Sequence, residues 1–387
     1  MRSTFAADPF KIAVPDAVLT DLAERLAHTR WPIEPKGKPW QYGADLTYLR
    51  EVVDHWRQDY DWRLWEAKLN TFPQYKAKID GHQLHFILER GSGPDPMPLL
   101  ITHGWPGSIV EFMDIIEPLA HPERFGGDPK DSFTVIAPSI PGYGFSDPPE
   151  EPITARDVAG LWNTLMVEVL GCNRYVAQGG DWGSCITSWL ALDHPGRLAA
   201  IHLNSLGLVP FRGEGAEPLT PEEIAWFTKA TKAYQPETGY QQIQGTKPQT
   251  LAYGLTDSPA GLAGWILEKF HGWTVPGQGR PPPFPIDHLL TNVMLYWLAG
   301  INASTWLYVS LLDGSGIHLK PGEKVEVPTG LLLFPNDLLA LPPDAWTKRS
   351  YNVVHRREAP MGGHFAALEN GPLLMEDMRS FFRKYRA

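Results

Sequence analysis

Cysteine is scarce in this sequence. Its 387 residues include only Cys172 and Cys185, too few for a disulfide framework or a structural zinc site. Uninterrupted apolar runs near the ~18 residues of a membrane-spanning helix are also missing. At the N-terminus an acidic residue, Asp8, comes before any apolar segment. These absences predict a protein without a membrane span or a secretory signal, located in a reducing cytoplasm.

Positive charge is also in short supply. Lys and Arg total 34 against 44 Asp and Glu, a net charge of -10, and no local basic patch offsets it, so nucleic acid is not an expected partner. The 36 glycines and 37 prolines stay below the share typical of disordered chains. The length exceeds the ~100–200 residues of a typical domain. We therefore expect two domains, or one core that carries a large insertion.

Residues 1–90 read as a helical extension that ends in a β-hairpin. Leucines at 19, 22 and 26 share one helical face, and apolar residues at 49, 52, 53 and 56 repeat at helical spacing. Such short helices need tertiary packing to persist, so we expect them to lie across the main body. Asp80-Gly81, between runs 75–79 and 82–88, is the signature of a tight hairpin turn.

From residue 91 onward the pattern changes to alternating strands and helices. Short apolar runs predict strands at 99–102, 133–137, 174–178, 199–203, 330–334 and 352–356. Capping pairs such as Thr154 with Asp157 predict helices between them. This is the pattern of a mostly parallel sheet with helices on both faces. It is interrupted at 207–325 by Trp- and Leu-rich helical segments, which we interpret as a helical cap inserted between core segments 91–206 and 326–387.

One turn has the sequence of a nucleophile elbow with an acid at its centre. Strand 174–178 runs into Gly179-Gly180-Asp181-Trp182-Gly183, and the sharp strand-to-helix turn of this motif requires small residues two before and two after the nucleophile. A carboxylate, Asp181, stands where esterases carry serine. On its own, the same pattern also fits a plain tight turn with Asp181 capping the helix.

Two later segments supply the partners that such a nucleophile needs. Asp337 follows the strand at 330–334, and His364 in Gly362-Gly363-His364-Phe365 follows the last strand. The order Asp181, Asp337, His364 is the chain order of nucleophile, acid and base in the α/β-hydrolase fold. His103-Gly104-Trp105 ends strand 99–102, where this fold places an oxyanion-hole donor. The expected donors are the backbone N–H groups of Trp105 and Trp182.

These motifs resemble those of the microsomal-type epoxide hydrolases, including that family's N-terminal extension. The similar segments are Trp31-Pro32, Tyr60-Asp61-Trp62-Arg63, Phe72-Pro73-Gln74-Tyr75, the 103–108 and 179–183 motifs, and 362–369. The resemblance implies hydrolysis of an epoxide to a vicinal diol without cofactor or metal. It also implies two cap tyrosines that protonate the epoxide oxygen, for which Tyr240 and Tyr308 match, with Tyr296 competing for the second role.

The expected mechanism follows from the chemistry of these groups. Asp181 would open the epoxide and form an ester. His364, oriented by Asp337, would then activate the water that hydrolyses it. The Trp, Leu and Phe content of the cap favours an apolar epoxide as substrate, with water as co-substrate. A homodimer is compatible with the family resemblance.

Two other functions use the same residues. A haloalkane dehalogenase-like enzyme shares the acidic nucleophile and the histidine base, but it would leave the tyrosine acids without a task. A non-catalytic ligand-binding protein could retain the fold, although an intact Asp181, Asp337 and His364 argues against it. His82 and His85 sit three apart in a predicted strand and therefore face opposite ways, so we expect surface positions rather than a shared metal.

Overall fold

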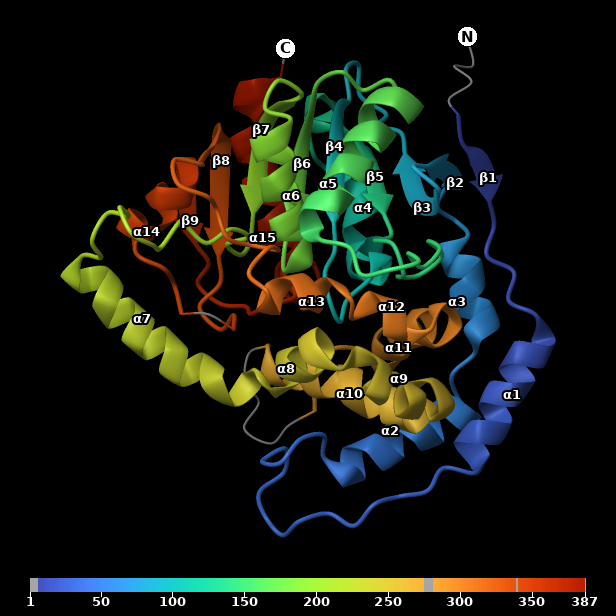
Figure 1. Cartoon of the computed structure of the whole chain (residues 1–387). Helices are drawn as coiled ribbons and strands as arrows, with labels where there is room; N and C mark the ends of the chain where they lie inside the picture. The colour runs from blue at the N-terminus through green and yellow to red at the C-terminus, as the bar shows by residue number, and fades with distance from the viewer. Residues whose placement is uncertain (1–5, 275–280, 339, 387) are drawn as a thin grey trace.

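In the computed structural model, which describes residues 6–274, 281–338 and 340–386, a single nine-stranded sheet forms the centre of the molecule (Figure 1). The strands are β1 (Asp8–Phe10), β2 (Gln74–Ile79), β3 (His82–Glu89), β4 (Met97–Thr102), β5 (Phe133–Pro138), β6 (Tyr175–Gly179), β7 (Leu198–Leu203), β8 (Val325–Leu333) and β9 (Tyr351–Glu358). Their spatial order is β1-β2-β3-β5-β4-β6-β7-β8-β9. Strands β1, β2 and β3 are antiparallel to their neighbours, and every pairing from β5 through β9 is parallel.

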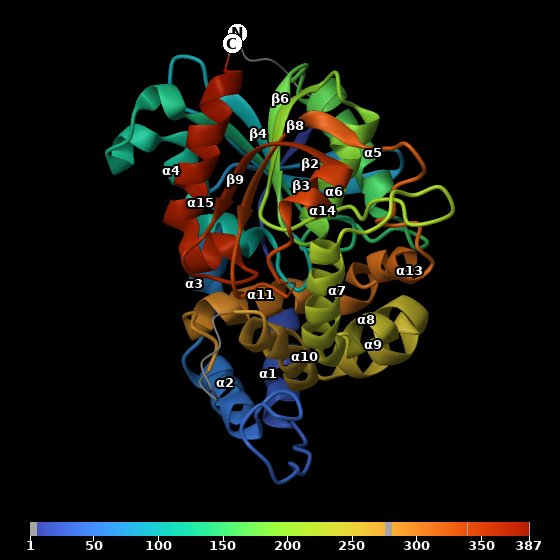
Figure 2. The same cartoon turned by 90° about the vertical axis from the view of Figure 1, so that its left-hand side faces the viewer.

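Helices cover both faces of this sheet. Figure 2 shows α4 (Met113–Ala120) and α15 (Ala366–Phe382) on one side and α5 (Ala155–Thr164) and α6 (Trp182–Asp193) on the other. The short helix α14 (Asp344–Ser350) precedes β9. The central strands β4 to β7 are almost wholly buried, as expected for parallel strands covered on both faces. The predicted α/β-hydrolase architecture is confirmed.

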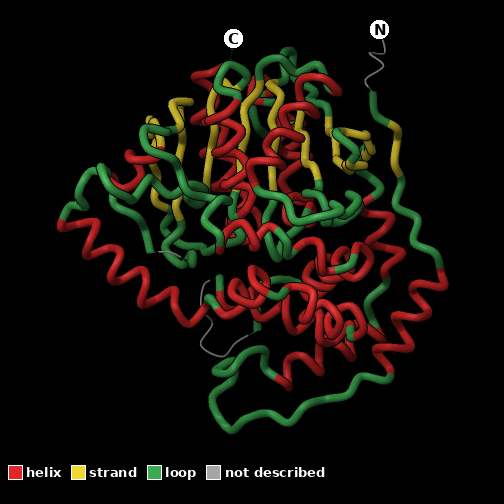
Figure 3. Tube along the Cα trace, viewed as in Figure 1, coloured by secondary structure: helices red, strands yellow, loops and turns green. Residues whose placement is uncertain are grey.

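In the residues that the structure describes, the cap consists of helices and connecting loops, and it lies across one end of the sheet (Figure 3). Asp181 and Phe334, which come just after β6 and β8, share a cavity with the cap residues Tyr240 and Tyr308. The cap helices are α7 (Pro221–Tyr234), α8 (Gly239–Thr246), α9 (Pro248–Asp257), α10 (Pro259–Gly272), α11 (Ile286–Ala299), α12 (Ile301–Ser304) and α13 (Leu307–Leu312). All seven come between β7 and β8 in the chain. In the part of the chain that the structure describes, no helix is both long and apolar enough to cross a bilayer.

The N-terminal helices wrap around the outside of the cap. They are α1 (Asp16–Ala27), α2 (Leu46–Gln58) and α3 (Trp62–Leu69), and both α1 and α2 contact α10. The apolar face of α2 buries Val52, Val53 and Trp56. His55 Nε2 lies 2.6 Å from the Asp287 carboxylate on α11. The extension therefore joins the cap on its outer side, while its hairpin β2-β3 extends the sheet.

Two sequence expectations need correction. His85 is fully buried, not on the surface, because the rings of Phe10 and Phe145 pack edge-on against it. Its ring nitrogens meet Gln74 Oε1 at 2.9 Å and Ser139 Oγ at 3.0 Å, and burial lowers its pKa to about 3. Strand β8 begins at Val325, five residues before the expected start. Its first half alternates buried and more exposed positions and contains Pro328. This half therefore lacks the continuous apolar run by which the other core strands were predicted.

Candidate active site

The turn between β6 and α6 holds Asp181 in a strained conformation. Asp181 has φ 51° and ψ -129°, a backbone geometry that non-glycine residues rarely adopt. The turn closes only because its flanks are glycine. A Cβ on Gly179 would lie 2.1 Å from the Gly183 carbonyl oxygen, and one on Gly183 would lie 1.9 Å from the Thr102 carbonyl oxygen. The result is a nucleophile elbow whose carboxylate projects above the sheet.

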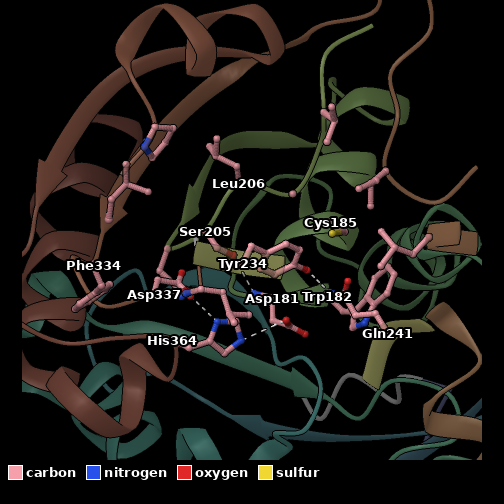
Figure 4. Close-up of a pocket in the computed structure, with 18 of the residues that line it drawn as sticks. Asp181, Trp182, Cys185, Ser205, Leu206, Tyr234, Gln241, Phe334, Asp337 and His364 are labelled. Atoms are coloured by element: carbon pink, nitrogen blue, oxygen red, sulfur yellow. Dashed lines mark hydrogen bonds and ion pairs between the residues drawn. The ribbon is translucent and has the colours of Figure 1, made fainter. Parts of the chain in front are cut away.

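Asp181, His364 and Asp337 come together although they are far apart in the chain (Figure 4). His364 Nε2 lies 3.2 Å from Asp181 Oδ2, and its Nδ1 lies 2.7 Å from Asp337 Oδ1. Burial alone would lower the pKa of His364, but the negative charge of Asp337 and the hydrogen bonds to both carboxylates outweigh it. They hold the pKa well above its usual range. This is the geometry of a nucleophile, base and orienting acid.

The loop after β4 supplies a donor to the same carboxylate. The Trp105 backbone N–H donates to Asp181 Oδ1 at 2.8 Å, as predicted for an oxyanion hole. Trp182, the other expected donor, is the first residue of α6. His103 braces the loop, with its Nδ1 3.1 Å from the Gly104 carbonyl oxygen while the Ile140 N–H approaches its Nε2 at 3.4 Å. Burial lowers the pKa of His103 to about 4, so this bracing imidazole is neutral at physiological pH.

Two cap tyrosines line the cavity in front of Asp181. Tyr240 on α8 and Tyr308 on α13 are both buried, with ring centroids 5.5 Å apart. Tyr240 stacks on Trp105 at 5.1 Å, and Tyr308 meets Trp182 edge-on at 5.1 Å. Burial raises the pKa of both phenols well above the usual value. Both hydroxyl groups are therefore protonated at neutral pH and available as donors.

Tyr296, the competitor for the second tyrosine, is otherwise engaged. Its hydroxyl donates to the Gly107 carbonyl at 2.6 Å, and its ring packs edge-on against Tyr143. It contributes to the loop that carries Trp105 rather than to the cavity wall. The Tyr308 hydroxyl is buried without a hydrogen-bond partner among the described residues. Tyr308 therefore matches the second tyrosine better than Tyr296 does, because the Tyr296 hydroxyl already donates to a backbone carbonyl.

The cavity is mostly apolar beyond this polar centre. The volume of the cavity is about 200 Å³. Its apolar walls include Trp226, Leu311, Ile317, Leu338 and Leu341. Tyr234 and Gln241 add polar groups, and the Gln241 amide hydrogen-bonds both the Tyr234 and the Tyr240 hydroxyls. Tyr234 lies outside the motifs identified in the sequence, and Gln241 directly follows Tyr240.

A second, smaller cavity behind Asp181 contains a buried carboxyl group. Glu111 is half of the Ser108–Glu111 pair before α4, and its carboxyl accepts the Ser108 N–H. It also shares with Asp181 and His364 a cavity of about 20 Å³, enough for one water molecule. Burial raises the pKa of Glu111 to about 8. Only the fold reveals that this capping residue faces the triad.

Among the residues that the structure describes, no three His, Cys, Asp or Glu side chains are arranged to hold a metal ion. The groups gathered at the site are two carboxylates, an imidazole and two phenol hydroxyls.

The elbow, the triad order and the inserted cap define an α/β-hydrolase, and residues 97–262 match the family model "alpha/beta hydrolase fold". Residues 7–112 match the model "Epoxide hydrolase N terminus". The chain is 36% identical to "Epoxide hydrolase 1" of Sus scrofa, over 96% of this chain and 88% of that protein. It therefore belongs to the epoxide hydrolase family.

Solved structures agree with this assignment. The juvenile hormone epoxide hydrolase of the silkworm Bombyx mori superposes with a TM-score of 0.85 at 30% identity, covering 99% of this chain and 95% of that chain. The epoxide hydrolase of Aspergillus niger gives a TM-score of 0.83 at 29% identity, covering 99% and 98%. Both comparisons span extension, core and cap together.

Proposed function

We propose that this protein converts an apolar epoxide to a vicinal diol through an ester on Asp181. One observation carries the proposal. The Asp181 carboxylate lies between His364 Nε2 and the Trp105 N–H, and it faces a cavity that two buried tyrosine hydroxyls also line. Nucleophile, base, oxyanion donor and proton donors are thus collected around one space of substrate size.

The first step is ring opening. Asp181 Oδ2 forms a bond to a ring carbon, the carbon–oxygen bond of the epoxide breaks, and a tyrosine proton passes to the leaving oxygen. A strained ether has no carbonyl to polarise, so the basic alkoxide is the species that needs stabilisation. Tyr240 and Tyr308, opposite Asp181 on the cap, can meet it with hydroxyl donors. The step leaves a hydroxyalkyl ester and one tyrosinate.

The second step regenerates the carboxylate. His364 takes a proton from water, and the resulting hydroxide adds to the ester carbonyl of Asp181 while Asp337 stabilises the imidazolium. Negative charge on the carbonyl oxygen falls beside the Trp105 N–H, with the Trp182 N–H as the expected second donor. The acyl carbon–oxygen bond then breaks, His364 protonates the departing diol, and the proton of the new carboxylic acid returns to the tyrosinate.

Blocking the second step should trap the ester, which makes the mechanism directly testable. We expect His364→Gln mixed with styrene oxide to gain the mass of one epoxide in intact-protein mass spectrometry. The matched control, Asp181→Asn in the same background, removes the nucleophile and should gain nothing. If several epoxides leave the mass unchanged while a haloalkane labels His364→Gln, the dehalogenase function takes the place of the epoxide hydrolase function.

A further inference from the structure

A lysine is buried directly against one of the two tyrosine rings. Lys269 on α10 is only 7% exposed. Its ammonium lies 4.8 Å from the centroid of the Tyr240 ring and 5.7 Å from that of Trp273. Lysine is among the residues least often buried, because removing an ammonium from water is costly. Its position under a ring of the site therefore calls for a function.

Lys269 forms two local ion pairs. Its Nζ lies 2.5 Å from Glu268 Oε2, on the same helix, and 3.9 Å from Glu237 Oε2, which approaches from the segment before α8. These carboxylates lie 25% and 34% exposed at their side chains, whereas the lysine side chain is 8% exposed. The two carboxylates thus contact the ammonium group on its solvent side, and the Tyr240 ring lies on its buried side.

The two tyrosines differ in what surrounds their hydroxyls. The Tyr240 hydroxyl accepts the Gln241 amide N–H at 3.0 Å, whereas that of Tyr308 has no such donor in the described part of the chain. The other ionisable groups that face Tyr240 are Tyr234 on α7, Asp181 on the elbow and Tyr308 on α13. Tyr234 and Asp181 raise the pKa of Tyr240 and so oppose formation of a tyrosinate, whereas the neighbouring Tyr308 hydroxyl lowers that pKa. Lys269 is the one nearby cation that the structure places on its ring.

We propose that Lys269 is a positioning residue that makes Tyr240 the stronger proton donor of the pair, because its ammonium stabilises the tyrosinate that forms as the epoxide opens. The inference rests on the proposed function. As Asp181 bonds to the ring carbon, its negative charge moves to the epoxide oxygen and then, with transfer of the hydroxyl proton, to Tyr240. A cation facing an aromatic ring attracts more strongly when that ring carries the charge of a phenolate.

The test compares two epoxides of nearly equal shape in the same protein. In a His364→Gln background, the rate of ester formation is followed by rapid quench and mass spectrometry with propylene oxide and with its trifluoromethyl analogue. The fluorinated alkoxide is a weaker base and needs less help from a proton donor. We expect Lys269→Met to slow ester formation about tenfold with propylene oxide and clearly less with the fluorinated epoxide. Lys269→Arg, which keeps the charge, should restore most of the rate.

A second comparison isolates the partner of Lys269. Adding Lys269→Met to Tyr240→Phe should cost no further rate, because no phenol remains to be tuned, whereas adding it to Tyr308→Phe should still cost about tenfold. Equal slowing with both epoxides, or an equal cost in both tyrosine backgrounds, would overturn the proposal and leave Lys269 a packing residue. Should methionine at 269 prevent folding, Lys269→Gln replaces it in the same comparisons. If His364→Gln alone forms no ester, the proposed function fails, independently of Lys269.

Discussion

Asp181 is held at both carboxylate oxygens by groups with different tasks. Oδ1 accepts the Trp105 N–H and Oδ2 faces His364. In the proposed mechanism, the attacking oxygen and the future oxyanion are therefore distinguished before substrate arrives. Preorganisation of this kind places donors where charge develops and requires little rearrangement during the reaction. In the same proposed mechanism, the tyrosine hydroxyls contact the substrate only at the epoxide oxygen.

Removing either phenol should therefore slow ring opening more than substrate binding. We expect Tyr240→Phe and Tyr308→Phe each to lower the rate of ester formation by about a hundredfold, with the larger loss at Tyr240. Single-turnover mass spectrometry measures this rate. Tyr253→Phe, at an exposed position on α9, is the matched control and should react like the parent. Parent-like rates in both of the other variants would remove the tyrosines from the mechanism.

The buried carboxyl of Glu111 should leave a signature in the pH dependence of stability. Its pKa is raised to about 8 by burial, so between about pH 4.5 and pH 8 the folded protein holds a proton that the unfolded chain releases. The stability contributed by this proton is complete at low pH and is lost as the pH rises through 8.

Glu111→Gln removes that titration. Its free energy of unfolding, relative to the parent, should rise with pH across this window by up to about 1.4 kcal/mol per pH unit. Urea unfolding at several pH values measures the difference. Parallel pH profiles for the two proteins would show that Glu111 is ionised in the folded state.

At the scale of the element, the elbow depends on two close backbone approaches. Gly183→Ala would force its new methyl group against the Thr102 carbonyl, so we expect a loss of about 2–4 kcal/mol in the free energy of unfolding and displacement of Asp181. Gly160→Ala is the control, because nothing lies within 4 Å of that position in α5. It should stabilise the protein by about 0.5–1 kcal/mol. Thermal unfolding of both variants tests this, and equal stability would contradict the close contact.

Sequence patterns predicted the elements whose signal is local. Buried runs located β4 to β7 within a residue or two, and the elbow and the two later loops carried local motifs. The cap tyrosines were chosen from the family resemblance, and their role stays a prediction. What failed depends on neighbours. His85 is buried against the rings of Phe10 and Phe145. Lys269 meets Tyr240 only because the fold brings these residues of α10 and α8 into contact. Neither environment can be predicted from the sequence on either side of the residue, because the contacts come from other segments of the chain.

At the scale of the whole molecule, the extension and the cap form one packed layer. Trp56 on α2 is 4% exposed, and α2 packs against α10, the helix that carries Lys269. Trp56→Ala should therefore loosen both helices, at a cost of about 3–5 kcal/mol. We expect amide hydrogen exchange to accelerate in α2 and α10 together while β4 and β6 stay protected. Continued protection of α10 would show that the cap is stable without the extension.

The place of the cap in the chain also has a consequence for how the molecule is made. Strands β7 and β8 pair in parallel, with Ile201 opposite Thr329, and the entire cap separates them along the chain. Pairings of such long sequence separation form slowly, because a large loop must close first. During synthesis the apolar edge of β7 therefore waits unpaired until the cap has emerged, a species prone to aggregation. We expect lesions in the cap to reduce the yield of native protein in cells more than the activity of the molecules that do fold.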